Sequence, residues 1–287
     1  MRIGRSLQVV LLSPLVVLLL GAVVLPALIL FGYSLFAWRL VEPTGPLTLD
    51  NYLAVLRDPL YRQLLVNTLV IAVPTTLGSV IGGYMLGYYV VFGHGPGRRL
   101  TLGLVVTALM ASYLVRIFAW RTLLGSNGVI NSFLVQTGVV AKPLDFLLFS
   151  PPAAILAEIA LLMPLAGLTF YAALAGISPA YREASRDLGA GRAETLVKVT
   201  IPLSGASILA TTALTFFLSA GDYITPVLVG GASSATLGTV VASSMGHAGN
   251  YGLGAAVAFI VLLGFVIAYV LLRAAMRRAR MLPERTV

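Results

Sequence analysis

The sequence predicts an all-α integral membrane protein with six transmembrane helices. Of its 287 residues, 59% are hydrophobic and only 10% are charged, and the charges are spaced so that long uncharged runs remain between them. In soluble domains roughly a quarter of the residues are charged. A helix needs about 20 apolar residues to cross the hydrocarbon layer. Composition and spacing together therefore indicate a multi-pass membrane protein.

Six segments have the length and apolar character of a membrane span. They cover about residues 7–37, 64–92, 100–124, 149–175, 199–221 and 253–272. Residues 223–252 are also uncharged, but their many Gly, Ser and Thr residues indicate a loop or a re-entrant piece that lies against protein. We expect one membrane domain over residues 1–287, with the first apolar run kept as a helix.

The distribution of Lys and Arg predicts the orientation in the membrane. With six spans and a cytoplasmic N-terminus, thirteen of these cations fall on the cytoplasmic side. Four fall outside, namely Arg39, Arg57, Arg62 and Lys142. Cytoplasmic loops of membrane proteins carry an excess of such residues. We therefore expect both termini in the cytoplasm, and we assign the net charge of +9 to topology and membrane lipid, not to nucleic acid.

Several kinds of chemistry are excluded by residue content. The chain has no Cys, and neither of its two lysines, Lys142 and Lys198, follows a Gly, so a phosphate-binding loop for ATP is impossible. Its two histidines, His94 and His247, fall on opposite sides of the membrane in this topology. We expect no metal site, no catalytic residues and no cofactor bound by this chain.

The polar stretch EASRDLGAGRAETLVKVTIP, residues 183–202, joins the fourth and fifth segments. Ser178 can cap a helix just before it, Pro179 suits the first turn, and Gly189 suits the left-handed residue that ends a helix. These signals predict a short helix over about residues 179–189.

One face of this short helix combines small and apolar residues. Tyr181, Ala184 and Leu188 share it by i, i+3, i+4 spacing. Charged residues flank the face, namely Arg182, Glu183, Arg186 and Asp187. Such a face suits docking into a groove of a soluble partner. The alternative is a solvated loop that only connects two spans.

A few charges lie inside the predicted spans, where each is costly to insert. They are Glu158, Asp222, Arg116 and Arg121. In one interpretation Glu158 and Asp222, with the adjacent Tyr223, face a central pathway and help a cationic solute through. In the other, Glu158 pairs with Arg116 while Arg121 and Asp222 reach the outer interface. Likewise GDYITP, residues 221–226, is either a broken element of an outer gate or a helix end stopped by Pro226.

The polar stretch resembles the EAA loop of binding-protein-dependent ABC importer permeases. Glu183, Ala184, Gly189 and Pro202 match the family pattern at its spacings, whereas Ser185, Val199 and Ile201 replace similar residues. The resemblance implies a type I importer permease fold. It also implies that the short helix is a coupling helix, which docks into the ATP-hydrolysing subunit through Tyr181, Glu183, Ala184, Asp187, Leu188 and Gly189.

Three further stretches are similar to the spermidine/putrescine-type permease group, namely TLDNYLAVLRDPLYRQLLVNTLVIA, SYLVRIFAWRTLLGSNGVINSFL and GDYITPVLVGG. This resemblance implies a polyamine as cargo, with iron(III), thiamine or a small organic anion as alternatives. It implies as partners two ATPase subunits that hold ATP and Mg, a second permease expected to be a different chain, and an extracytoplasmic solute-binding protein. The competing class is a self-sufficient secondary transporter or channel that needs no ATPase.

Overall fold

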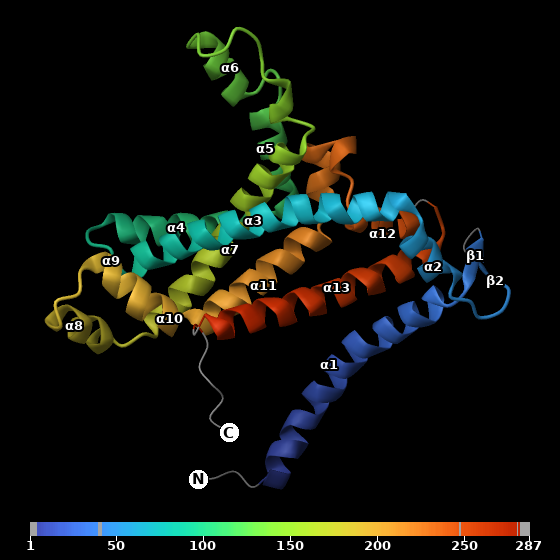
Figure 1. Ribbon diagram of the computed structural model, residues 1–287, viewed down its shortest axis with the longest axis horizontal. Coiled ribbons are helices and arrows are strands. Elements are labelled where there is room, and N and C mark those ends of the chain that lie inside the picture. Colours follow the sequence, from blue (N-terminus) through green and yellow to red (C-terminus); the bar gives the residue numbers. More distant parts are fainter. Residues whose placement is uncertain (1–4, 40–41, 247, 280, 282–287) are drawn as a thin grey trace. The chain divides into compact units, whose positions relative to one another are not determined.

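Figure 1 shows the computed structural model, which describes residues 5–39, 42–246, 248–279 and 281. The chain divides into two compact units, each built from separate stretches of sequence. The first unit comprises the residues up to Arg62 together with Val240–Leu262, and the second comprises Gln63–Thr239 together with the residues from Leu263 on. Helices α3 (Pro59–Phe92) and α13 (Tyr251–Arg278), and the short α12 (Leu237–Gly246), run across this division.

The first unit contains α1 (Arg5–Ser34), a small hairpin of β1 (Ala37–Arg39) and β2 (Glu42–Thr44), and α2 (Asp50–Arg57). The two strands pair antiparallel, with Trp38 opposite Pro43. The Asn51 side chain donates hydrogen bonds to the carbonyl oxygens of Ser34 and Phe36, at 2.9 and 2.8 Å. These bonds satisfy carbonyls that the end of α1 leaves without helical partners.

The second unit holds most of the remaining helices around α7 (Pro151–Ala175). Before α7 come α4 (Gly97–Met110), α5 (Tyr113–Leu124), α6 (Val129–Gln136) and η1 (Asp145–Leu147). After it come α8 (Pro179–Asp187), α9 (Arg192–Thr195), η2 (Leu196–Thr200), α10 (Ile201–Leu203), α11 (Gly205–Gly221), η3 (Pro226–Gly230) and η4 (Ala232–Ser234). Helix α7 packs against α4, α5 and α11.

Glycines bring α3 and α7 into close contact. A Cβ added at Gly83 would lie 2.5 Å from the Ala166 Cβ, and one added at Gly87 would lie 2.8 Å from the Phe170 Cβ. Small residues four apart allow helix backbones to approach in a membrane, where packing drives association because lipid is as apolar as the side chains. Residues Thr169 and Thr211, whose hydroxyls lie 3.1 Å apart, join α7 to α11 on the other side.

Among the described residues, four helices are long and apolar enough to cross a membrane, or six if each bent helix pair counts as one span. Two of the expected spans are therefore bent. The third breaks between α4 and α5, which meet at 103°, because Ala111 and Ser112 have extended backbone. The fifth bends by 72° at Ser204, just after Pro202, which lacks the N–H of a regular helix.

Candidate functional site

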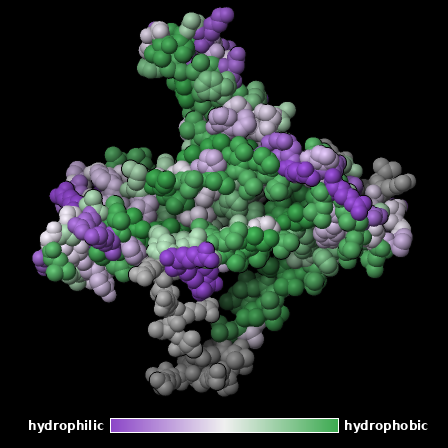
Figure 2. Space-filling view, viewed as in Figure 1, coloured by the Kyte–Doolittle hydropathy of each residue, from purple (hydrophilic) through white to green (hydrophobic). Residues whose placement is uncertain are grey.

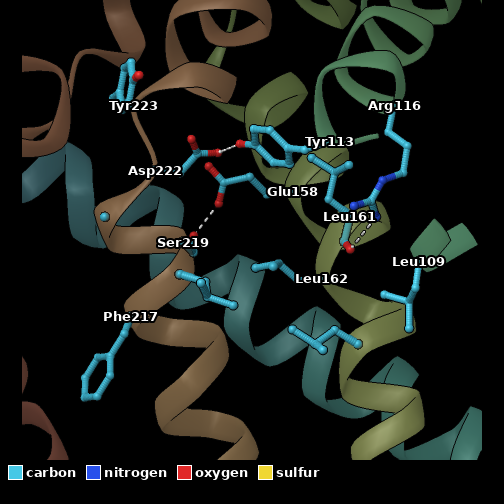
Figure 3. A pocket seen from close by; sticks show the side chains of 13 residues that line it. Leu109, Tyr113, Arg116, Glu158, Leu161, Leu162, Phe217, Ser219, Asp222 and Tyr223 are labelled. Atoms are coloured by element: carbon cyan, nitrogen blue, oxygen red, sulfur yellow. Dashed lines mark hydrogen bonds between the residues drawn. The ribbon is translucent and has the colours of Figure 1, made fainter. Parts of the chain in front are cut away.

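A pocket of about 480 Å³ opens between α4, α5, α7 and α11 in the second unit (Figure 3). Its polar lining residues are Tyr113, Arg116, Glu158, Ser219, Asp222 and Tyr223. Leucines from α4, α7 and α11, together with Phe217, supply most of the apolar wall. Its volume is in the range of small-molecule sites, about 300–1,000 Å³. Polar groups in an apolar wall inside a membrane bundle make this pocket a candidate for a functional site.

Glu158 lies in the wall of this pocket with only 1% of its surface exposed. Its Oε2 accepts a hydrogen bond from the Ser219 hydroxyl of α11. Its Oε1 forms no hydrogen bond with any described residue, although the Thr75 hydroxyl of α3 lies close enough to interact with the carboxyl group. Leu161, Leu162 and Leu165 follow at i+3, i+4 and i+7, so the pocket-facing stripe of α7 is apolar apart from this carboxyl group.

Arg116 lines the same pocket but forms no ion pair with Glu158. The only ion pair among the described residues joins Lys198 and Glu194 at 2.6 Å, far along the chain. The Arg116 Nη1 donates instead to the Leu161 carbonyl oxygen at 3.2 Å, and its buried Nε has no partner within the described chain. The interpretation in which Glu158 is neutralised by Arg116 is therefore wrong for this arrangement.

Asp222 follows the last residue of α11, as the sequence predicted, and its carboxylate is bound on both oxygens. Its Oδ2 accepts from the Tyr113 hydroxyl and from the Thr225 hydroxyl, each at 2.5 Å. Its Oδ1 accepts from the Ile224 backbone N–H at 2.8 Å. Asp222 thus caps the helical turns that follow it and ties them to α5.

The segment GDYITP is a break in a helix rather than a helix end. The backbone is extended at Asp222 and is helical again from Ile224 through η3, so Pro226 lies near the start of the next helical turns and does not stop α11. Gly231 ends these turns with φ +70°, and a Cβ there would lie 2.9 Å from the Phe149 Cβ. This break forms one edge of the pocket through Asp222 and Tyr223.

The remaining two pathway candidates differ from each other. Tyr223 lines the pocket and is 46% exposed. Arg121 does not line it, and its guanidinium lies 5.6 Å from the centre of the Phe149 ring. Four of the five predicted pathway residues are thus brought together, namely Glu158, Asp222, Tyr223 and Arg116, whereas Arg121 lies apart.

Sequence reasoning missed Tyr113 and Ser219. Tyr113 precedes Arg116 by three residues and shares a face of α5 with it, and Ser219 precedes Asp222 by three residues at the end of α11. Polar residues at that spacing from an intramembrane charge were the signal that could have found them. Within the part of the chain that the structure describes, no cluster of His, Asp and Glu has the form of a metal site.

Helix α8 forms a second candidate site, and none of its residues is fully buried. Its helical residues begin at Pro179, as expected, although Ser178 caps it through its backbone carbonyl, which accepts from Tyr181 N–H at 3.3 Å, and not through its side chain. Gly189 has φ +86°, and Ala190 N–H donates to Ser185 O at 3.1 Å, which closes the helix end as predicted.

The apolar face of α8 is available to a partner. Tyr181 is 58% exposed and Leu188 is 88% exposed, and Ala184 lies between them on the same face. The two acidic coupling candidates, Glu183 and Asp187, are also exposed. On the inner side, the Ser185 and Thr195 hydroxyls lie 3.1 Å apart and join α8 to α9.

Comparisons with known proteins agree with this architecture. A family model described as "Binding-protein-dependent transport system inner membrane component" matches residues 79–281. The spermidine/putrescine transport system permease protein PotB of Escherichia coli is 30% identical over 209 residues, which cover 73% of this chain and 75% of that protein. PotB of Haemophilus influenzae is 30% identical over 84% of this chain and 82% of its own length.

A solved structure shares the fold at low sequence identity. It is a bacterial alginate ABC transporter in complex with an alginate pentasaccharide-bound periplasmic protein. One of its chains matches with a TM-score of 0.78 and 17% identity, over 96% of this chain and 95% of that chain.

Proposed function

The chain belongs to the family of binding-protein-dependent transport system inner membrane components, and from that membership we propose that it is a permease subunit that passes a polyamine. As a permease component it moves a solute and is not itself an enzyme. The support for a cationic cargo is the pocket of the second unit, where the Glu158 carboxyl group has no ion-pair partner among the described residues.

Within the pocket the two carboxylates have different roles. Asp222 is already bound by donors of this chain, so it holds the broken segment in place. Glu158 Oε1 forms no hydrogen bond within the described part of the chain, and it attracts the ammonium group of the cargo. The Tyr223 ring is 46% exposed and is available to a cation, which the quadrupole of an aromatic ring attracts, whereas the Phe217 ring stacks on Phe265.

The energy for transport comes from ATPase subunits that dock on α8. Tyr181, Ala184 and Leu188 supply the apolar contact, and Glu183 and Asp187 supply charges at its rim. When the ATPase subunits close, the pull on α8 reaches α11 through α9 and α10, and rocking of rigid helices opens the pocket to alternate sides. Bending is expected at Ser204, where the 72° bend already lies.

The complete importer contains more than this chain. We propose two ATPase subunits that bind ATP and Mg, a second and different permease, and a solute-binding protein on the outer side. Both termini lie in the cytoplasm in this arrangement, which puts α8 on the cytoplasmic side. The PotB relatives support the polyamine, whereas the likeness to an alginate transporter extends to the fold alone.

The test measures ATP hydrolysis by the complete complex, purified from native membrane in mild detergent with its partners. Spermidine, putrescine, thiamine, an iron(III) complex and an organic anion are each offered with the solute-binding protein. We expect polyamines to stimulate hydrolysis. Glu158→Gln, which removes the charge and keeps the shape, is expected to lower this stimulation about tenfold or more, equivalent to about 1.4 kcal/mol.

Glu42→Gln is the matched control, because it makes the same chemical change at an exposed position on β2. We expect it to leave the stimulation unchanged. Stimulation by an anion instead of a polyamine would overturn the proposed cargo. Transport by this chain alone under an ion gradient would replace the importer with a secondary transporter.

A further inference from the structure

A second pocket, of about 350 Å³, lies where α3 ends and α8 and α9 begin. Four basic residues line it, namely His94, Arg182, Arg186 and Arg192. The rest of its wall is formed by Gly93 and the rings of Tyr88, Tyr89 and Phe92 at the end of α3. No carboxylate lines this pocket.

The positive charge of this pocket is not neutralised within the described chain. The only ion pair there is that of Lys198 with Glu194, so none of the three arginines is paired with a carboxylate. The Arg182 guanidinium stacks on Phe92, with its Cζ 3.7 Å from the ring centre, and its Nε is buried without a hydrogen-bond partner. Like charges held together are unfavourable until an anion joins them.

The arginines are turned away from the docking face of α8. At about 100° per residue, Arg182 and Arg186 lie roughly 150° around the helix from the face of Tyr181, Ala184 and Leu188. The stacking of Arg182 on Phe92, the last residue of α3, confirms that this side faces the end of a membrane span. An anion from the membrane therefore fits better than an acidic surface of a docked ATPase.

An apolar stripe on α3 leads to the pocket. Leu77, Ile81, Met85 and Tyr89 follow one another at four-residue spacing, and all are exposed large side chains. Figure 2 shows the same contrast, with hydrophilic surface where α8 and α9 lie and largely hydrophobic surface along the helices next to them. A molecule with a negative head and apolar tails matches both features.

We propose that this pocket, defined by His94, Arg182, Arg186 and Arg192, binds the phosphate of an anionic phospholipid headgroup. The acyl chains lie along the α3 stripe, and the guanidinium groups, which suit phosphate oxygens, hold the head. Because Arg182 and Arg186 belong to α8, the bound lipid fixes the position of the helix on which the ATPase is proposed to dock. This inference does not depend on the identity of the cargo.

The experiment places the complete complex in nanodiscs of phosphatidylcholine alone or of phosphatidylcholine mixed with phosphatidylglycerol. Native mass spectrometry then counts the phosphatidylglycerol molecules that stay bound after release in detergent. We expect the wild-type complex to retain phosphatidylglycerol in preference to phosphatidylcholine. The double variant Arg182→Gln/Arg186→Gln is expected to retain it at least fivefold more weakly, since each basic residue near an anionic surface contributes about fivefold.

Arg277→Gln/Arg278→Gln is the matched control, because it removes the same charge from the last turn of α13. Arg192→Gln is a second test variant, because the Arg192 side chain forms no hydrogen bond or ion pair within the described chain and its replacement is expected to leave the fold intact. Equal retention in all variants would overturn the site. Displacement of the bound phosphatidylglycerol by inorganic phosphate would assign the site to a free anion instead of a lipid. Loss of the ATPase from the double variant with lipid retention unchanged would assign the arginines to the protein interface and overturn the proposal.

Discussion

The acidic side chains of the pocket around Glu158 and those of the exposed helix α8 differ in burial and in hydrogen bonding. In the pocket, Asp222 is bound by four side-chain and backbone donors of its own chain, and Glu158 is 1% exposed. On α8, Glu183 and Asp187 are exposed and unpaired among the described residues. Buried charges need partners inside the protein, because desolvation is costly. Exposed charges stay hydrated and remain available to bind a second protein. The pocket is therefore suited to binding a solute, and α8 is suited to binding a subunit.

The largest loss of stability is expected from placing a side chain in the close contact between α3 and α7. In Gly83→Val the new Cβ would lie 2.5 Å from the Ala166 Cβ and 2.8 Å from the Gly167 backbone N, neither of which can move freely. We expect the free energy of unfolding to fall by about 3 kcal/mol. Little folded permease should remain, measured as the fraction that survives heating in detergent. Gly103→Val on α4, where nothing lies within 4 Å, serves as the control. Equal survival of both variants would contradict the close packing of α3 and α7.

A smaller and different effect is expected at the end of α8. Gly189→Val puts a β-branched residue at φ +86°, which costs an L-residue roughly 1–2 kcal/mol. The permease should fold normally, whereas cargo-stimulated ATP hydrolysis should fall about tenfold as the helix end frays. Gly191→Val changes a glycine two residues away whose φ is −69° and whose surroundings are open. If both variants hydrolyse ATP alike, the shape of this helix end has no part in coupling.

The smallest loss of stability is expected from a variant that tests how Asp222 is held in place. Tyr113→Phe removes one donor to its carboxylate and leaves those of Thr225 and Ile224. We expect a loss of about 1 kcal/mol in stability and a modest fall in transport, read from thermal unfolding and from uptake into vesicles. Tyr223→Phe is the control, because no hydrogen bond of that hydroxyl is present in the described chain. A larger loss in the control would show that Asp222 does not depend on α5.

Local signals predicted α8 well. The start at Pro179 and the left-handed Gly189 depend only on neighbours along the chain, and both are found as expected. The bends at Ala111 and Ser204 were not predicted, since uncharged length alone does not reveal where a span changes direction. Pro202 was noted in the sequence, but one proline does not give the angle of a bend.

The pocket was predicted only in part, because its shape depends on which helix faces meet. Glu158 and Arg116 are neighbours in the pocket wall, yet the arginine bonds to the Leu161 carbonyl instead. No spacing rule distinguishes a side chain that reaches a carboxylate from one that reaches a backbone oxygen. Tyr113 and Asp222 are 109 residues apart in sequence, and only the packing of α5 on η3 brings them together.

The glycine contacts between α3 and α7 have a mechanical consequence. Two helices whose backbones touch at Gly83 and Gly87 cannot slide past each other by half a turn without a collision. We therefore expect the pair to move as one rigid unit. Bending is expected where regular helix is interrupted, at Ala111, Ser204 and Asp222. Because these interruptions lie outside α3 and α7, we expect the neighbouring helices to change direction while the pair keeps its shape.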